Sequence, residues 1–146
     1  MSRRKAIFLM LFILITVFIF KNSAKDAVES TIQSDSLVGW VIEHFSFLFK
    51  DRGEATYYVR KFAHFTEFFA QSAALSGAIF SVKYYKNFIY VLFAGFCTAC
   101  VDEYIQLFFE GRSGQISDVF VDFSGTILSV ICFMILWLVV FKKAGK

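Results

Sequence analysis

The chain has 146 residues, of which 58% are hydrophobic and 21 are phenylalanine, with no proline and a formal net charge of +3. Such a composition excludes a soluble globular protein of this length, because too few polar side chains remain to cover its surface, and it indicates a membrane protein. The small net charge argues against nucleic acid as a partner, and an odd number of cysteines, all in apolar runs, excludes a secreted disulfide framework.

Four apolar stretches are predicted to cross the membrane as helices, because about 20 apolar residues are needed to span the hydrocarbon core. These stretches cover residues 6–20, 59–82, 88–108 and 118–141. No internal repeat or second soluble domain interrupts them. The predicted fold class is therefore an all-α membrane protein, a bundle of four transmembrane helices that forms a single domain over residues 1–146.

The segment between the first two predicted spans, residues 21–58, differs in character because it mixes charged residues with the apolar run LVGWVIEHFSFLF. We predict an amphipathic helix that lies on the extracellular membrane surface, with Trp40 at the depth of the interface. A soluble loop with an incidental apolar run is the alternative. His44 in this run is expected to be an interfacial residue rather than a ligand.

Basic residues flank the predicted spans in three clusters. They are Arg3, Arg4 and Lys5 before the first span, Lys83 and Lys86 between the second and third, and Lys142, Lys143 and Lys146 after the fourth. Basic residues near span ends favour the cytoplasm, and one orientation places all three clusters on the same side. The sequence therefore predicts a multi-pass protein of the bacterial cell membrane with both termini in the cytoplasm.

Polar side chains gather toward the predicted outer ends of three spans, whereas the inner halves hold no ionisable side chain except cysteine. They are Arg60, Lys61, His64, Glu67, Asp102, Glu103, Gln106, Asp118 and Asp122, with Arg112 in the loop between the last two spans. Helical periodicity places most of them on one seam of each helix, above small residues. A charge facing lipid at mid-depth costs on the order of 3 kcal/mol. We therefore expect an outward-facing polar pocket; the alternative is solvated charges that merely mark helix ends.

The motifs VRKFAHFTEFF (59–69) and VDEYIQLFFEGRSGQISDVFVDFSGT (101–126) resemble those of the VanZ-like family of small bacterial membrane proteins. The matching positions are Arg60, Lys61, His64, Glu67, Asp102, Glu103, Gln106, Gly111, Arg112, Asp118, Asp122 and Gly125. Glu110 stands where the family often has proline, which is expected to loosen the loop. The resemblance implies a role in resistance to the lipoglycopeptide teicoplanin, which acts at the outer face of the cell membrane. It does not imply a particular reaction.

The first functional hypothesis is a site that binds or modifies an amphiphile of the outer leaflet. The ligand would be a membrane lipid, a lipid-linked cell-wall intermediate or the antibiotic itself. Arg60, Lys61 and Arg112 are expected to hold its phosphate or carboxylate. Gln106 and Asp118 complete the predicted ligand-binding set.

The second hypothesis assigns catalysis to His64, Glu67, Asp102, Glu103 and Asp122. One version uses a divalent metal, for which magnesium, manganese and calcium fit the carboxylates as well as zinc does. The other version uses no metal, with His64 as a base and Glu67 orienting it. A third hypothesis is a structural network in which His64, Glu67, Gln71 and Gln106 satisfy one another while function lies in partner contacts. A small transporter is the remaining alternative.

Overall fold

The computed structural model describes residues 2–79 and 87–141, and these form five α-helices and one short 3₁₀ helix without any strand. In chain order they are α1 (Arg3–Ser23), α2 (Ala27–Phe45), η1 (Ser46–Leu48), α3 (Arg52–Ile79), α4 (Phe88–Gln106) and α5 (Ile116–Phe141). The all-α prediction is confirmed. The basic clusters at Lys83 and Lys86 and after the fourth span lie outside the described residues.

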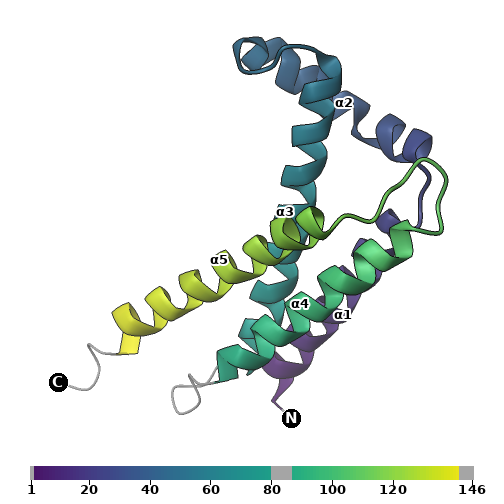
Figure 1. The fold of residues 1–146 in the computed structure, drawn as a ribbon. Coiled ribbons are helices and arrows are strands. Elements are labelled where there is room, and N and C mark those ends of the chain that lie inside the picture. The colour runs from purple at the N-terminus through teal and green to yellow at the C-terminus, as the bar shows by residue number, and fades with distance from the viewer. Residues whose placement is uncertain (1, 80–86, 142–146) are drawn as a thin grey trace.

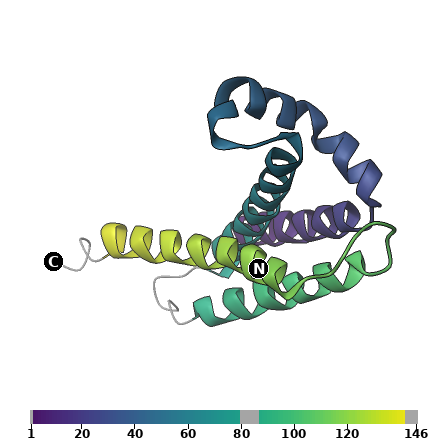
Figure 2. The same cartoon turned by 45° about the horizontal axis from the view of Figure 1, so that its top comes forward.

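Helix α3 is the centre of the arrangement, because it packs against α1, α2, α4 and α5. Figure 1 shows α3 passing through the middle of the molecule, with α1 and α4 side by side on one flank and α5 on the other. The rotated view in Figure 2 shows the same order and places α2 above the other helices. The starts of α1 and α4 and the ends of α3 and α5 lie at the end of the molecule away from α2.

Three of the described helices are long and apolar enough to cross a membrane, namely α1, α4 and α5 as far as Leu136. The predicted first span, 6–20, is part of a longer helix of 21 residues. Helix α3, which contains residues 59–79 of the predicted span 59–82, does not meet the same standard, because polar residues such as His64, Glu67 and Gln71 lower the hydropathy of its described part. The prediction of four spans is therefore confirmed for three helices.

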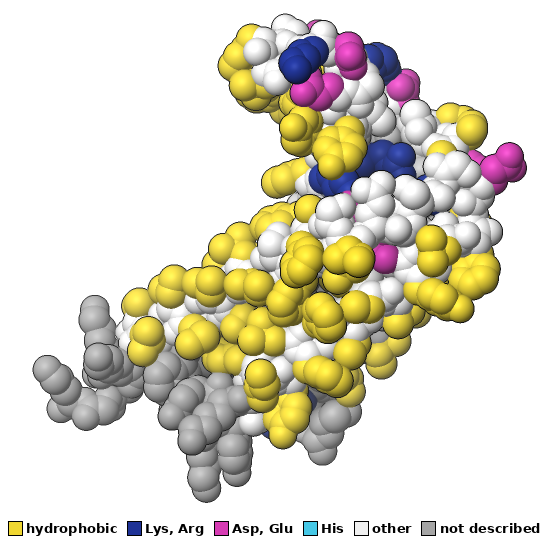
Figure 3. Space-filling view, in the orientation of Figure 1, with side chains coloured by type: hydrophobic (Ala, Val, Ile, Leu, Met, Phe, Trp, Pro, Cys, Tyr) yellow, Lys and Arg dark blue, Asp and Glu magenta, His cyan; other side chains and the backbone are white. Residues whose placement is uncertain are grey.

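The lower part of the molecule has an apolar surface. Met10 and Leu14 on α1 and Phe93 on α4 are each more than half exposed, as expected for side chains that face lipid. Figure 3 shows hydrophobic side chains over most of this part, with the charged side chains gathered in the upper part and at its junction with the lower one. On the face seen in this view the lower part is thus mainly apolar, whereas the upper part exposes charged and hydrophobic side chains together.

Small residues allow the helices to approach closely at depth, as their spacing predicts. A Cβ atom added to Gly125 on α5 would collide with the backbone carbonyl oxygen of Phe65 on α3, and one added to Gly95 on α4 would collide with Thr126 on α5. Ala74 and Ala99, on the seams of α3 and α4, are buried. The close approach brings the polar upper turns of these helices together.

Helix α2 occupies half of the predicted surface segment 21–58, so the prediction of a helix there is confirmed. Asp26 caps it by accepting a hydrogen bond from the backbone N–H of Glu29 at 2.7 Å. Its apolar residue Val38 packs with Ala55 and Val59 of α3. Trp40 stacks on His44, whose Nδ1 lies 2.9 Å from the Trp40 carbonyl oxygen. That α2 lies on a membrane stays a prediction.

The loop from 107 to 115 joins α4 to α5 and touches the start of α2. The backbone N–H of Ala27 donates a hydrogen bond of 3.0 Å to the carbonyl oxygen of Glu110. Gly111 has a φ of +70°, a conformation that side chains other than glycine rarely adopt. Glu110, which stands where the family often has proline, thus joins this loop to α2 through its backbone carbonyl, and the loosening of the loop by the missing proline stays a prediction.

Candidate functional site

A cavity of about 280 Å³ opens where the upper turns of α3, α4 and α5 meet the 107–115 loop. Eight of the ten predicted site residues line it: Arg60, Lys61, His64, Glu103, Gln106, Arg112, Asp118 and Asp122. Glu67 lines an adjoining cavity of about 200 Å³ that shares Arg60, His64 and Arg112 with the first. Asp102 lies behind His64 and is fully buried. The structure therefore brings all ten residues together, while their individual roles stay predictions.

The three basic side chains of the cavity differ in their partners. Lys61 forms an ion pair with Asp118. Arg112 donates a hydrogen bond of 3.2 Å from Nε to Oε1 of Gln106. Within the part of the chain that the structure describes, neither Arg60 nor Arg112 forms an ion pair with an acidic side chain. Two half-buried guanidinium groups therefore face the cavity without a bound carboxylate.

Burial also affects Arg112 itself, which lies in the loop outside the helices. Desolvation lowers the pKa of its guanidinium from the usual value, whereas the nearby carboxylates of Asp102, Glu103 and Asp118 act in the opposite direction. A guanidinium stays charged in a protein in spite of such a shift. The cavity therefore holds a partly desolvated cation, which favours an anionic ligand.

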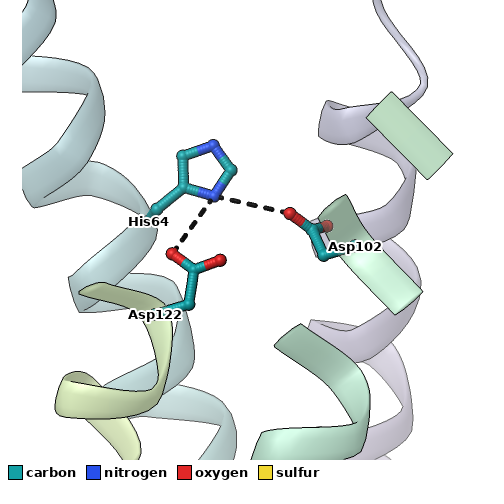
Figure 4. A group of neighbouring side chains, drawn as sticks. All are labelled: His64, Asp102 and Asp122. Atoms are coloured by element: carbon teal, nitrogen blue, oxygen red, sulfur yellow. Dashed lines mark ion pairs between the residues drawn. The ribbon is translucent and has the colours of Figure 1, made fainter. Parts of the chain in front are cut away.

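His64, Asp102 and Asp122 meet at the inner end of the cavity, each from a different helix (Figure 4). Nδ1 of His64 lies 3.7 Å from Oδ2 of Asp102 and 3.7 Å from Oδ1 of Asp122. Both separations exceed the usual hydrogen-bond range of about 2.7–3.2 Å. Nδ1 of His64 and Oδ2 of Asp122 are buried without a hydrogen-bond partner. The three groups are close, but they do not satisfy one another.

Asp102 is held firmly by its neighbours. The hydroxyl of Ser23 at the end of α1 donates a hydrogen bond of 2.5 Å to Oδ1, and Nε2 of Gln106 donates one of 3.1 Å to Oδ2. Since Asp102 and Ser23 are both fully buried, this contact fixes α1 against α4. Ser23 was not among the predicted site residues.

Glu103 connects α4 to the start of α5. Its Oε1 accepts a hydrogen bond of 2.9 Å from Nε2 of Gln106, and its Oε2 accepts one of 2.9 Å from the backbone N–H of Gln115. The backbone at Gly114 passes so close that an added Cβ would lie 2.6 Å from the Glu103 carbonyl oxygen. Oε2 thus positions the loop while Oε1 is engaged by Gln106 on α4, and a catalytic role for Glu103 stays a prediction.

Glu67 and Gln71 on α3 find their partners on other helices. Oε1 of Glu67 accepts a hydrogen bond of 3.1 Å from Asn22, while its Oε2 is buried without a partner. Nε2 of Gln71 donates to Thr16 on α1 at 2.8 Å and to Thr98 on α4 at 3.3 Å. The prediction that His64, Glu67, Gln71 and Gln106 satisfy one another is therefore wrong, and no hydrogen bond joins His64 to Glu67 as base and orienter.

Helix α1 supplies the contacts that sequence reasoning missed, through Thr16, Asn22 and Ser23. Thr16 and Ser23 are seven residues apart, so two helical turns place them on one face of α1. That spacing was the available signal. It was weak, because hydroxyl side chains are common in apolar helices and bond to their own backbone there, as Thr16 does to Phe12 at 2.8 Å.

Comparison with known families settles the relationship suggested by the motifs. The model of the family described as VanZ/LLP1 matches residues 7–138, nearly the whole chain. The chain belongs to the VanZ/LLP1 family. The match extends beyond the two motifs to α1 and α2, so the VanZ/LLP1 relationship covers Ser23 and Asn22 as well as the charged residues of α3, α4 and α5. Searches of curated proteins and of solved structures gave no match.

Proposed function

We propose that the cavity receives the anionic headgroup of an amphiphile in the outer leaflet of the bacterial cell membrane. The observation that carries this proposal is the pair Arg60 and Arg112, which line the cavity and form no ion pair with a described acidic side chain. A guanidinium presents paired N–H donors that match a phosphate or a carboxylate. The ligand is a lipid-linked cell-wall intermediate or teicoplanin itself, which would connect the site to resistance against that antibiotic.

The lower surface supports a ligand with an acyl or polyprenyl chain. The cavity lies directly above the apolar region of the molecule, so a headgroup held by the arginines would leave its chain beside lipid-facing side chains (Figure 3). Tyr57 and the hydrogen-bonding Gln106 also line the cavity. The lining is otherwise mostly polar or charged, so the cavity suits the headgroup, and the chain of the amphiphile would lie outside it.

We place α3 as the fourth span, shielded from lipid by its neighbours. At about 1.5 Å of rise per residue, this helix of 28 residues is longer than the roughly 30 Å thickness of a hydrocarbon core. Gln71, Ser72 and Ser76 are buried against other helices, so the polar groups that lower its hydropathy do not meet lipid.

The basic residues at both ends of the chain place the termini in the cytoplasm and the cavity outside. This orientation predicts that alkaline phosphatase fused after Lys146 is inactive and that a fluorescent protein fused there is bright. The same phosphatase inserted after Gly53, near the start of α3, is expected to be active. Activity of the C-terminal phosphatase fusion would show that the orientation is the opposite one and would exclude a cavity on the outer face.

Headgroup recognition is tested by comparing a polyprenyl phosphate with the matching uncharged polyprenol. We expect the purified protein to bind the phosphate at least about tenfold more tightly, because hydrogen bonds to charged groups contribute roughly 1.5–3 kcal/mol. Arg112→Gln should remove most of this preference while keeping the affinity for the polyprenol. Native mass spectrometry or thermophoresis of the full-length protein in detergent provides the affinities.

Arg52→Gln is the matched control, because Arg52 is an exposed arginine that already pairs with Asp35 and lies outside the cavity. Its phosphate preference should equal that of the unmodified chain. Equal binding of phosphate and alcohol, or an equal loss in both variants, would reject the proposed recognition. Teicoplanin measured as a second probe distinguishes the two sources of the anionic group.

A further inference from the structure

We propose that His64, Asp102 and Asp122 bind one divalent transition-metal ion of the zinc or manganese class at the inner end of the cavity. These residues come from α3, α4 and α5, and one potential ligand atom from each lies within 4.8 Å of the others. The inference goes beyond recognition of an anionic headgroup, because it assigns a metal to the residues beneath that site. It rests on three independent features of the cluster.

The first feature is the spacing of the ligand atoms. Nδ1 of His64 is 3.7 Å from an oxygen of each aspartate, so it lies symmetrically with respect to both (Figure 4). Metal bonds of about 2.1 Å place two ligands of one ion roughly 3.0–4.2 Å apart, depending on the angle at the metal. The observed separations fall in that range and lie outside the hydrogen-bond range.

The second feature is the lack of any other partner for buried polar atoms. Asp122 is 1% exposed, yet its Oδ2 has no hydrogen-bond partner, and Nδ1 of His64 has none either. A proton on Nδ1 could be donated to one aspartate, but at 3.7 Å neither carboxylate oxygen accepts such a hydrogen bond in the structure. Buried polar atoms are rarely left in this state. An ion between the three side chains would bind Nδ1 of His64, and it would also satisfy Oδ2 of Asp122 if this carboxylate binds through both of its oxygens.

The third feature is the charge balance. Asp102 and Asp122 are two buried carboxylates at close range, and no described lysine or arginine forms an ion pair with either. Lys61, a nearby cation, is engaged by Asp118. Burial of unpaired charges of like sign is costly, and a divalent cation removes that cost.

The surroundings of Asp102 are those of a metal ligand. Ser23 occupies its Oδ1, and Gln106 donates to one lone pair of its Oδ2, which leaves the other free toward His64. Hydrogen bonds of this kind orient ligating carboxylates in metalloproteins. The geometry of Asp102 is thus fixed before an ion arrives.

The donor set determines the class of ion. An imidazole nitrogen favours zinc and similar transition metals, and two carboxylates also suit manganese, whereas calcium and magnesium prefer oxygen ligands alone. His64 and Asp122 line the cavity, so the remaining coordination positions face it. An anionic oxygen of the ligand would complete the coordination there; this last role rests on the proposed function, whereas the metal site does not.

Metal content is the primary test. The full-length protein is purified in detergent, freed of metal with a chelator and dialysed against Zn²⁺ or Mn²⁺. Its metal content is then measured by inductively coupled plasma mass spectrometry. We expect about one ion per chain, the stoichiometry of a single three-ligand site. Asp122→Asn and His64→Asn should each lose it. Asp35→Asn, which changes an exposed carboxylate outside the cavity, should retain a full ion at saturating metal.

Thermal stability separates ligation from a merely structural role. In chelator, Asp122→Asn should melt at least as high as the unmodified chain, because it removes one of two neighbouring buried charges. Saturating Zn²⁺ or Mn²⁺ should raise the Tm of the unmodified chain by about 5 °C or more and leave that of Asp122→Asn unchanged.

An unmodified chain that takes up no ion and shows no Tm shift would overturn the proposal, as would Asp122→Asn or His64→Asn binding as much metal as the unmodified chain. Equal binding of Mg²⁺ or Ca²⁺ would overturn the assignment to a transition metal. None of these measurements involves an amphiphile, so their failure is distinguishable from failure of headgroup recognition.

Discussion

Replacing Arg60 and Arg112 together by glutamine is expected to abolish the proposed protection against teicoplanin. The two guanidinium groups line the cavity without a described carboxylate partner, so their loss removes the charge available to an anionic headgroup. Glutamine keeps hydrogen-bonding capacity and much of the side-chain length. The minimal inhibitory concentration in a susceptible Gram-positive host expressing the variant should therefore fall to the value of the empty vector.

The same host expressing Arg52→Gln serves as the control and should keep full protection, because Arg52 lies on the exposed surface in a pair with Asp35. Membrane abundance of each variant is measured with an antibody to a C-terminal tag. Retained protection by the Arg60 and Arg112 double variant at normal abundance would exclude both arginines from the activity. Loss of protection together with loss of protein would indicate a folding role instead.

Gly125→Ala is expected to destabilise the bundle by about 3 kcal/mol, toward the upper end of the cost of overpacking. The added Cβ would collide with the carbonyl oxygen of Phe65, which belongs to the backbone of α3 and has no rotamer in which to avoid it. Helices α3 and α5 must then separate. His64 and Asp122 lie within one turn of this contact, so the inner end of the cavity would open with it.

This loss of stability can be followed through the native thiols. Cys97 and Cys132 are half-buried free cysteines, so their reactivity during heating in detergent reports unfolding. The midpoint should fall by roughly 10 °C for a change of this size. Gly77→Ala is the control, because its Cβ would meet only the side chain of Phe8 near the start of α1, a ring that can rotate away. Equal midpoints for the two variants would contradict the role of Gly125.

The burial of the polar residues on α4 and α5 followed from the sequence alone. Asp102 and Gln106 are four residues apart, and Asp122 and Ser129 are seven apart, so each pair shares a helical face with small residues. All four are buried in the structure. Helical periodicity is a local property, which is why it could be predicted without knowing how the helices pack.

Pairing between helices could not be predicted in the same way. Ser23 and Asp102 are 79 residues apart in the chain, and their hydrogen bond depends on the axial position of α1 relative to α4. A shift by one turn would give Asp102 a different neighbour, and an apolar helix such as α1 carries little pattern that fixes its position. The partners of Glu67 and Gln71 were missed for the same reason.

The start of α3 had a local signal that counting apolar residues overlooked. Asp51 accepts a hydrogen bond of 2.8 Å from the backbone N–H of Glu54, while the Glu54 carboxylate accepts one of 2.7 Å from the N–H of Lys50. An acidic residue followed three positions later by glutamate is typical of a helix N-terminus. The helix therefore begins at Arg52, seven residues before the predicted span.

The hydrogen bond between Ala27 and Glu110 connects α2 to the 107–115 loop, which carries the cavity residue Arg112. Gly111 allows the chain to turn immediately afterwards, and an added Cβ there would press on Ala27, so the backbone from Glu110 to Arg112 follows the first turn of α2. Val28 and Ile32 on that part of α2 are largely exposed. A movement of α2 would therefore also move the loop that carries Arg112, the side chain proposed to bind the headgroup.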